Sequence, residues 1–187
     1  MVATLPRRAM LTGVLALTSC ASTSPELYTL DPPPGAVRRG GPRAIEVRSV
    51  GLARYLERSQ IVRSSENYRL DVLPNDWWGE PLDAMLGRVL ARALTQRLPG
   101  STVFVESGAI SAQPDATVQL NVQRLDENAA GAVLLSAQFS VVRRTPDTRA
   151  VTLTVPVRAA GTPGLVAAMS DAVGQLADRI AAAMAVG

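Results

Sequence analysis

The chain has 187 residues, of which 47% are hydrophobic and 19% charged, a balance typical of a globular protein with a core, so disorder throughout is excluded. It contains no His and no Lys, and all 19 basic residues are Arg. A Ser, Thr or Cys nucleophile usually needs His or Lys as its base, and zinc or iron sites draw on His or on several Cys. We therefore expect no catalytic site, no metal site and no cofactor. Carboxylate-pair chemistry of the glycosidase type stays open, although sixteen scattered Asp and Glu are more often surface charges.

The net charge excludes one further class. It is formally +3, but two of the 19 Arg lie in a segment that we expect to be removed, which leaves 17 against 16 acidic residues. A near-neutral chain without a cluster of basic residues has no electrostatic footprint for nucleic acid. Nucleic acid is therefore excluded as a partner.

Residues 1–19 have the form of a lipoprotein signal peptide. Arg7 and Arg8 supply the charged part, residues 9–17 supply an apolar part too short to span a membrane, and small residues follow. The four residues that end at Cys20, LTSC, resemble a bacterial lipobox, in which the Cys is acylated and becomes the first mature residue. Because Cys20 is the only Cys in the chain, we predict lipid attachment there rather than a buried, inert thiol.

Acylation of Cys20 would anchor the protein to a membrane. Burial contributes about 0.8 kcal/mol per CH₂, so one chain binds marginally whereas the several chains of a lipoprotein hold permanently. The residue after Cys20 is Ala21 and not Asp. By resemblance to enterobacterial lipoprotein sorting, this favours the outer membrane, with the protein facing the periplasm. Arg7-Arg8 also loosely resembles a twin-arginine signal, so Sec and twin-arginine export both stay open.

The mature chain begins with a short polar tether at residues 21–25. Residues 26–30 alternate like a small strand before the sequence DPPPG at residues 31–35 breaks the pattern. We assign residues 20–42 to a lipidated N-terminus with a short strand and a Pro/Gly-rich linker, and residues 43–187 to one domain.

The first half of this domain centres on one amphipathic helix. Apolar and polar side chains alternate over residues 44–50 and predict a strand. Residues 55–72 predict a loop, a strand at 60–63, a turn and a strand at 68–72. Pro81 suits a first helical position, and Pro99-Gly100 ends the helix. Its apolar stripe, which needs a sheet to cover it, comprises Leu82, Met85, Leu86, Val89, Leu90, Ala93, Leu94 and Leu98, with Asp83, Arg88, Arg92 and Gln96 on the other side.

The second half predicts four strands and a second helix. The strands cover residues 101–106, 116–123, 133–141 and 151–155, and turn chemistry at residues 126–131 and 145–148 favours an antiparallel meander. Thr162 as cap and Pro163 as first residue open a helix with one apolar stripe from Leu165 to Met184. The sequence thus predicts an α+β fold, a largely antiparallel sheet with two main amphipathic helices packed against it.

Several short motifs, spaced along this sequence, resemble those of the ABC-type transport auxiliary lipoprotein family, whose best-known member is PqiC. They are YLERSQIVR at residues 55–63, a Tyr-bearing strand, WGEPL at residues 78–82, and Arg88, Val89, Leu90 and Ser170. The resemblance covers nearly the whole mature chain. Two positions depart from the family pattern: Trp77 doubles the aromatic, and Gly79 stands where larger residues such as Ala are usual.

The resemblance implies a non-enzymatic accessory component of an MCE/ABC-type (mammalian-cell-entry) system that carries lipids between two membranes. It implies MCE-domain and permease proteins as partners, and a homo-oligomeric ring. A lipoprotein subunit of another envelope export or cell-wall assembly complex is the first alternative. A carboxylate-based envelope hydrolase is the second.

Four residues are candidates for contact with a partner or a second copy. Tyr55 and Leu56 form an apolar pair in a loop ringed by charges, which suits an interface core with a polar rim. Trp77 and Trp78 precede the central helix and are either an exposed edge or core residues, with the core position favoured for Trp78.

Overall fold

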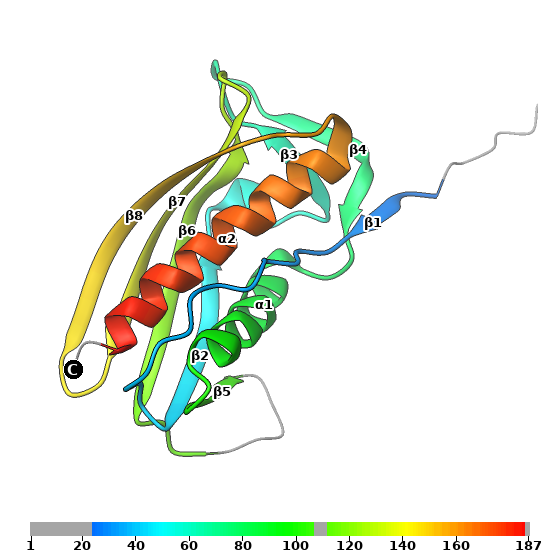
Figure 1. The fold of residues 1–187 in the computed structure, drawn as a ribbon. Helices are drawn as coiled ribbons and strands as arrows, with labels where there is room; N and C mark the ends of the chain where they lie inside the picture. The colour runs from blue at the N-terminus through cyan, green and yellow to red at the C-terminus, as the bar shows by residue number, and fades with distance from the viewer. Residues whose placement is uncertain (1–23, 107–111, 186–187) are drawn as a thin grey trace, which may run out of the picture.

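The computed structural model describes residues 24–106 and 112–185, and within these ranges eight strands form one sheet that carries two α-helices on one face (Figure 1). The predicted signal peptide and Cys20 lie outside the described residues. In chain order the elements are β1 (Glu26–Tyr28), β2 (Ala44–Leu52), a 3₁₀ turn η1 (Arg54–Leu56), β3 (Gln60–Ser64), β4 (Asp71–Trp78), α1 (Leu82–Arg97), β5 (Thr102–Val105), β6 (Ala116–Glu127), β7 (Ala132–Val142), β8 (Pro146–Pro156) and α2 (Gly161–Ala185).

The long strand β6 organises the sheet. It pairs with β7 in antiparallel register, and β8 follows antiparallel to β7, so the predicted meander is confirmed. On its other edge β6 pairs in parallel with β2, which pairs in parallel with β5. The hairpin of β3 and β4 joins the end of β6 through Ser64 and Glu127, and β1 lies parallel to β4 at the outside. The α+β class is confirmed, and the sheet is mixed.

The core lies between this sheet and the two helices. Helix α1 packs on β2 and β5, whereas α2 packs on β7 and β8. Every residue predicted for the apolar stripe of α1 is buried, and the stripe of α2 from Leu165 to Met184 is buried as well. Each large apolar side chain buried in this way contributes roughly 1.5–3 kcal/mol. Among the described residues, no helix combines the length and apolarity needed to cross a membrane.

The predicted strand at residues 68–72 begins too early. Asn67 and Tyr68 have φ angles of 54° and 61°, so they form a left-handed turn, a conformation that Asn tolerates better than most residues. Strand β4 therefore starts at Asp71 and continues to Trp78, which makes Trp77 and Trp78 strand residues.

The bounds of β6, β8 and α2 also differ from those predicted. Asp126, expected in a turn, is the penultimate residue of β6, and the turn after it depends on Asn128, whose Oδ1 accepts hydrogen bonds from the backbone N–H groups of Ala130 and Ala132. Strand β8 begins at Pro146, inside the predicted turn. Thr162 lies in the first turn of α2, and its hydroxyl donates to Asp76 Oδ2 over 2.9 Å instead of capping the helix.

The packing of α1 gives a first prediction. Leu90→Asp places an unpaired charge among buried side chains, at a cost of several kcal/mol that is comparable with the whole stability of a domain, about 5–15 kcal/mol. We expect this variant not to fold. Arg92→Ala, two residues along the same helix, removes only an exposed ion pair with Asp31 and should cost about 0–1 kcal/mol. Thermal melts followed by circular dichroism check both variants, and equal midpoints would show that α1 faces the other way.

Candidate functional site

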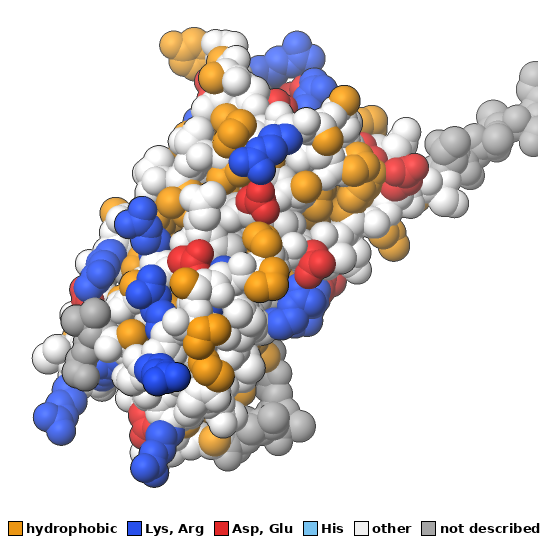
Figure 2. Space-filling model, viewed as in Figure 1, with side chains coloured by type: hydrophobic (Ala, Val, Ile, Leu, Met, Phe, Trp, Pro, Cys, Tyr) orange, Lys and Arg blue, Asp and Glu red, His pale blue; other side chains and the backbone are white. Residues whose placement is uncertain are grey.

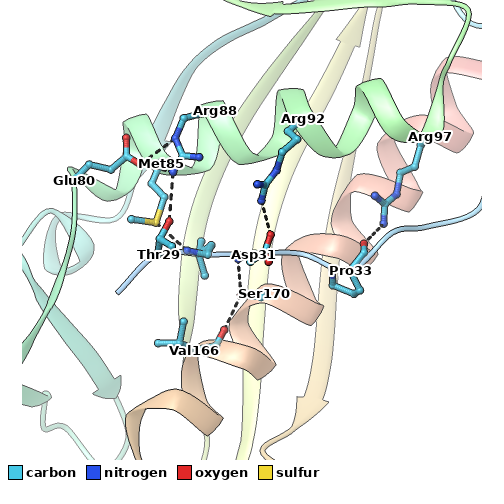
Figure 3. Close-up of polar contacts among 11 residues, drawn as sticks. Thr29, Asp31, Pro33, Glu80, Met85, Arg88, Arg92, Arg97, Val166 and Ser170 are labelled. Carbon is cyan, nitrogen blue, oxygen red and sulfur yellow. Dashed lines mark hydrogen bonds and ion pairs between the residues drawn. The ribbon is translucent and has the colours of Figure 1, made fainter. Parts of the chain in front are cut away.

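The segment expected to be a linker is packed between the two helices (Figure 3). Residues 29–38, called the N-terminal segment below, run lengthwise beside α1, between α1 and α2 and on the side away from the sheet (Figure 1). The side chain of Leu30 is buried, and its backbone N–H donates to Met85 Sδ of α1. The N–H of Asp31 donates to Ser170 Oγ of α2 over 3.0 Å. Two consecutive residues of the segment are therefore bonded to different helices, Leu30 to α1 and Asp31 to α2.

Polar residues of α1 add further contacts to the N-terminal segment. Arg92 pairs with the Asp31 carboxylate over 2.7 Å, and Gln96 exchanges hydrogen bonds with the backbone of Gly35. Arg88 pairs with Glu80 and reaches Thr29 Oγ1. The side of α1 opposite the apolar stripe is thus partly used in folding. Exposed ion pairs of this kind contribute only about 0–1 kcal/mol each.

Arg97 joins α1, α2 and the N-terminal segment. It is only 2% exposed, and its Nε lies 2.6 Å from Asp178 Oδ1 of α2. Its Nη2 donates to the carbonyl oxygens of Gly174, at 3.0 Å, and of Pro33. Arg97 is not among the candidate residues predicted from the sequence. Position 97 continues the buried stripe, since it lies three residues after Leu94 and seven after Leu90, and that spacing was the available signal.

A glycine in the segment permits this close approach. A Cβ built on Gly35 would overlap both the Arg97 guanidinium and the Asp178 carboxylate, so any other residue there would require this ion pair to shift. On the helix side, a Cβ at Gly174 would lie 3.3 Å from Pro33 Cδ, closer than ordinary packing. The segment and α2 are therefore matched in shape as well as in polar contacts.

The predicted contact pair Tyr55-Leu56 lies in the 3₁₀ turn η1, and only one of the two side chains is accessible. Leu56 is 3% exposed and belongs to the core, so the expectation of an exposed apolar pair is corrected. Tyr55 is half-buried, and its hydroxyl donates to Asp126 Oδ2 over 2.8 Å. Burial, followed by the hydrogen bond to Asp126, raises the pKa of the Tyr55 hydroxyl well above its ordinary value of 10.

Asp126 is the second buried polar centre. It is fully buried and accepts hydrogen bonds from Tyr55, from Ser65 Oγ at 2.7 Å and from Arg124 Nε at 2.8 Å. Arg124 also pairs with Glu66 beyond the end of β3. These contacts tie η1 and the β3–β4 turn to the end of β6. Because its oxygens are occupied by these donors, Asp126 acts as a structural group.

The two Trp side chains separate, since adjacent residues of a strand point to opposite faces. Trp78 is buried among core residues, as favoured from the sequence, and its backbone N–H donates to Ser59 O. Trp77 is half-buried, and its ring N–H donates to Pro74 O over 2.9 Å. Only Trp77 presents part of its ring to the outside.

A groove of about 700 Å³ lies next to the predicted contact residues, of which Trp78 alone is among its lining. It lies between the residues that follow η1 and the start of α1, with the end of β2 beside it, and is lined by Val50, Gly51, Leu52, Glu57, Arg58, Ser59 and residues 78–83. A second hollow of about 410 Å³ continues from it beneath α1, where a Cβ at Gly87 would come no nearer than 4.0 Å to Val50 and Val105. This arrangement of apolar floor and charged rim suits binding.

Charges on the helix-bearing face are mixed. Figure 2 shows Arg side chains spread over that face, with Asp and Glu side chains between them in its central part. Within residues 24–106 and 112–185, no three His, Cys, Asp or Glu side chains gather in a way that would hold a metal ion.

Comparison with known proteins decides the family. A family model described as "ABC-type transport auxiliary lipoprotein component" matches residues 28–181. The chain belongs to this family. The resemblance recognised in the sequence is thereby confirmed, and the match includes the N-terminal segment. Among curated proteins, none matches the chain.

Solved structures support the fold. The crystal structure of an uncharacterized protein aligns with a TM-score of 0.72 and 21% identity, covering 86% of this chain and 99% of that one. A Xanthomonas campestris protein of the family DUF330 aligns with a TM-score of 0.69 and 17% identity, covering 85% and 93%. A dodecameric PelC variant from Paraburkholderia phytofirmans aligns at 0.43 and 12%, covering 82% and 94%, which is too low for any argument. At these identities the likeness concerns the fold alone.

The junction at Arg97 gives a second prediction. Arg97→Met keeps the length of the side chain but leaves Asp178 and two carbonyl oxygens without their partner, a kind of loss that costs up to about 3–5 kcal/mol in buried pairs. We expect a lower urea midpoint and faster tryptic cleavage at Arg38 and Arg39. Arg92→Met, which removes only the exposed ion pair with Asp31, is the matched control and should change both much less. Equal cleavage rates in the two variants would show that Arg97 does not hold the N-terminal segment.

The Tyr55 hydrogen bond gives a third prediction, in its pH dependence. Because the fold favours the neutral phenol, the stability from this group is fully present below its unfolded pKa of about 10 and is lost as the pH rises above that value. Tyr55→Phe should lower the urea midpoint at neutral pH, since Asp126 loses a donor at a cost of about 1–3 kcal/mol. Tyr55→Phe should also remove part of the stability loss that the wild type shows as the pH rises above about 10.

The control for this prediction is Tyr68→Phe, at a fully exposed ring. It should leave the midpoints unchanged at neutral and alkaline pH. If Tyr55→Phe and the wild type lose stability equally between about pH 9 and 11, the phenol of Tyr55 does not couple to folding.

Proposed function

We propose that this chain is an outer-membrane lipoprotein that faces the periplasm and acts by binding, as an accessory component of an MCE/ABC-type intermembrane lipid transport system. Its partners in this proposal are membrane lipid, through acyl chains on Cys20, and the MCE-domain and permease proteins of the complex. Self-assembly into a ring is part of the proposal.

One observation carries it: the match to the auxiliary lipoprotein family from residue 28 to residue 181, eight positions after a lone Cys that ends a lipobox-like sequence. The packing of the N-terminal segment supports it. An anchor at Cys20 would pull on β1 and on a segment held by both helices, so the anchor would be joined firmly to the folded body.

The side chains support the proposal of a role in binding. The chain has no His or Lys to activate a nucleophile, and Asp126, the fully buried carboxylate, is occupied by Tyr55, Ser65 and Arg124. The grooves beside α1 combine apolar floors with mixed charges, which is the composition of a contact surface. Of the four contact candidates, Tyr55 and Trp77 keep accessible surface. Leu56 and Trp78 are buried and would contribute by holding their accessible neighbours in place.

The anchor gives the fourth prediction. Cys20→Ala should leave the fold and the thermal midpoint unchanged, because residue 20 lies outside the family region, but should release the protein from membranes. Fractionation after osmotic shock measures this, with Cys20→Ser as a second unacylated variant. Mutant protein that stays in the washed outer-membrane pellet would show that another part of the chain provides the anchor.

A pull-down of the acylated protein from solubilised membranes tests the partner. Co-purification of MCE-domain or ABC-permease proteins is the expected result. Recovery of components of another export or cell-wall assembly complex in their place would contradict the transport assignment and leave the lipoprotein anchor intact.

A further inference from the structure

Leu27 is an exposed apolar residue in the first strand. It lies in the middle of β1, at the outer edge of β4 (Figure 1), and is 67% exposed. Strand β1 pairs in parallel with β4, and Leu27 is the direct partner of Trp77 in that register. Directly paired residues of neighbouring strands share one face of a sheet. Leu27 and the partly exposed ring of Trp77 therefore form one patch, called the Leu27–Trp77 patch below.

The acidic residues of these two strands lie on the opposite face. Glu26 and Asp76 are direct partners, one position before Leu27 and Trp77, so alternation turns them the other way. Their contacts agree with this: Asp76 accepts a hydrogen bond from Thr162 at the start of α2, and Glu26 accepts one from the Tyr28 hydroxyl over 2.7 Å. The neighbour of Trp77 on β3 is the neutral Gln60. The Leu27–Trp77 patch thus carries none of the acidic groups of β1 or the end of β4.

Chain length brings this patch close to the proposed anchor. Cys20 and Leu27 are seven residues apart, and seven extended residues span at most about 25 Å. Two residues after Tyr28 the chain is already fixed, because Leu30 is buried and bonded to Met85 and because Asp31 is bonded to Ser170. An acylated Cys20 would therefore hold the β1 edge, rather than a freely swinging domain, beside the lipid surface.

We propose that the Leu27–Trp77 patch lies in the membrane interface next to acylated Cys20 and sets the orientation of the domain on the bilayer. The occupant of the patch is a lipid surface. Indole rings are enriched at the depth of lipid headgroups, and burial of the Trp77 ring there leaves no donor unpaired because its N–H is bonded to the Pro74 carbonyl oxygen. The neighbouring Leu27 adds apolar surface to the patch. Apolar side chains of surface-bound proteins enter about 5–10 Å into that region. The inference rests on the proposed function for the acylation of Cys20 alone.

The two Trp residues of the chain allow a direct test. Full-length acylated protein is reconstituted into vesicles of phosphatidylethanolamine and phosphatidylglycerol, with or without bromine on the acyl chains as a quencher. Trp78→Phe leaves Trp77 as the emitter, and Trp77→Phe leaves the buried Trp78. We expect brominated lipid to quench the emission of Trp77 and to leave that of Trp78 unchanged. The difference between wild type and Trp77→Phe reports Trp77 even where Trp78→Phe does not fold.

A charge in the patch is the complementary variant. Leu27→Asp should reduce quenching of Trp77 while the protein still sediments with the vesicles, because the acyl chains remain. Val37→Asp is the matched control, since Val37 is 60% exposed on the N-terminal segment and lies away from β1, and it should leave the quenching unchanged.

Three results would overturn the inference. The first is equal emission of Trp77 in brominated and plain vesicles to which the wild type is bound. The second is equal quenching of Trp77 and Trp78. The third is a fall in the mass of soluble Cys20→Ala protein on adding Leu27→Asp, measured by light scattering, which would make the patch a contact between copies. Wild-type protein that does not sediment with vesicles would contradict the acyl anchor itself, so failure of the proposed function is distinguishable.

Discussion

The two helices share one face of the sheet, and the fold depends on how the seam between them is closed. Helix α1 covers β2 and β5, α2 covers β7 and β8, and the N-terminal segment runs between them. Arg97 closes the seam by reaching Asp178, Gly174 and Pro33 at once. A buried guanidinium is favourable only when its donors are satisfied, so helix α1, helix α2 and the segment must take their places together. This makes the junction a source of specificity for the arrangement.

The same junction limits how far the domain could rotate relative to an anchor at the N-terminus. In many anchored proteins a flexible linker separates anchor and domain, and the domain is then free to rotate. Here Leu30 is buried two residues after β1, and Gly35 fits against the Arg97–Asp178 pair only because it lacks a Cβ. The short chain between residue 20 and β1 would thus transmit the position of the membrane to the body. The grooves beside α1 would keep a fixed orientation relative to the lipid, as suits a component that docks with a larger assembly.

The second polar centre, at Asp126, fixes the position of η1 and of the candidate contact surface beside it. Tyr55, Ser65 and Arg124 converge on its carboxylate, which ties η1 and the β3–β4 turn to β6. Leu56 adds an apolar contact to the core. The residues Glu57 and Arg58 that follow are therefore presented at the groove of about 700 Å³ on a rigid support. A contact surface of this kind loses little conformational entropy on binding.

Periodicity and local chemistry in the sequence were enough to predict both helices, the meander of β6 to β8 and the burial of Trp78, because these features depend on side-chain alternation and on turns between elements adjacent in the chain. The family came from the resemblance of several short stretches of the sequence. Cys20 also comes from the sequence alone. Only the tertiary structure revealed the parallel pairing of β2 with β6, the burial of Leu56 and Asp126, and the place of residues 29–38 between the helices. Each of these depends on partners more than fifty residues apart, as in Tyr55 with Asp126 or Pro33 with Arg97. A one-dimensional pattern holds no information on such distances, so an isolated Asp reads as a turn and a Pro-rich run reads as a linker.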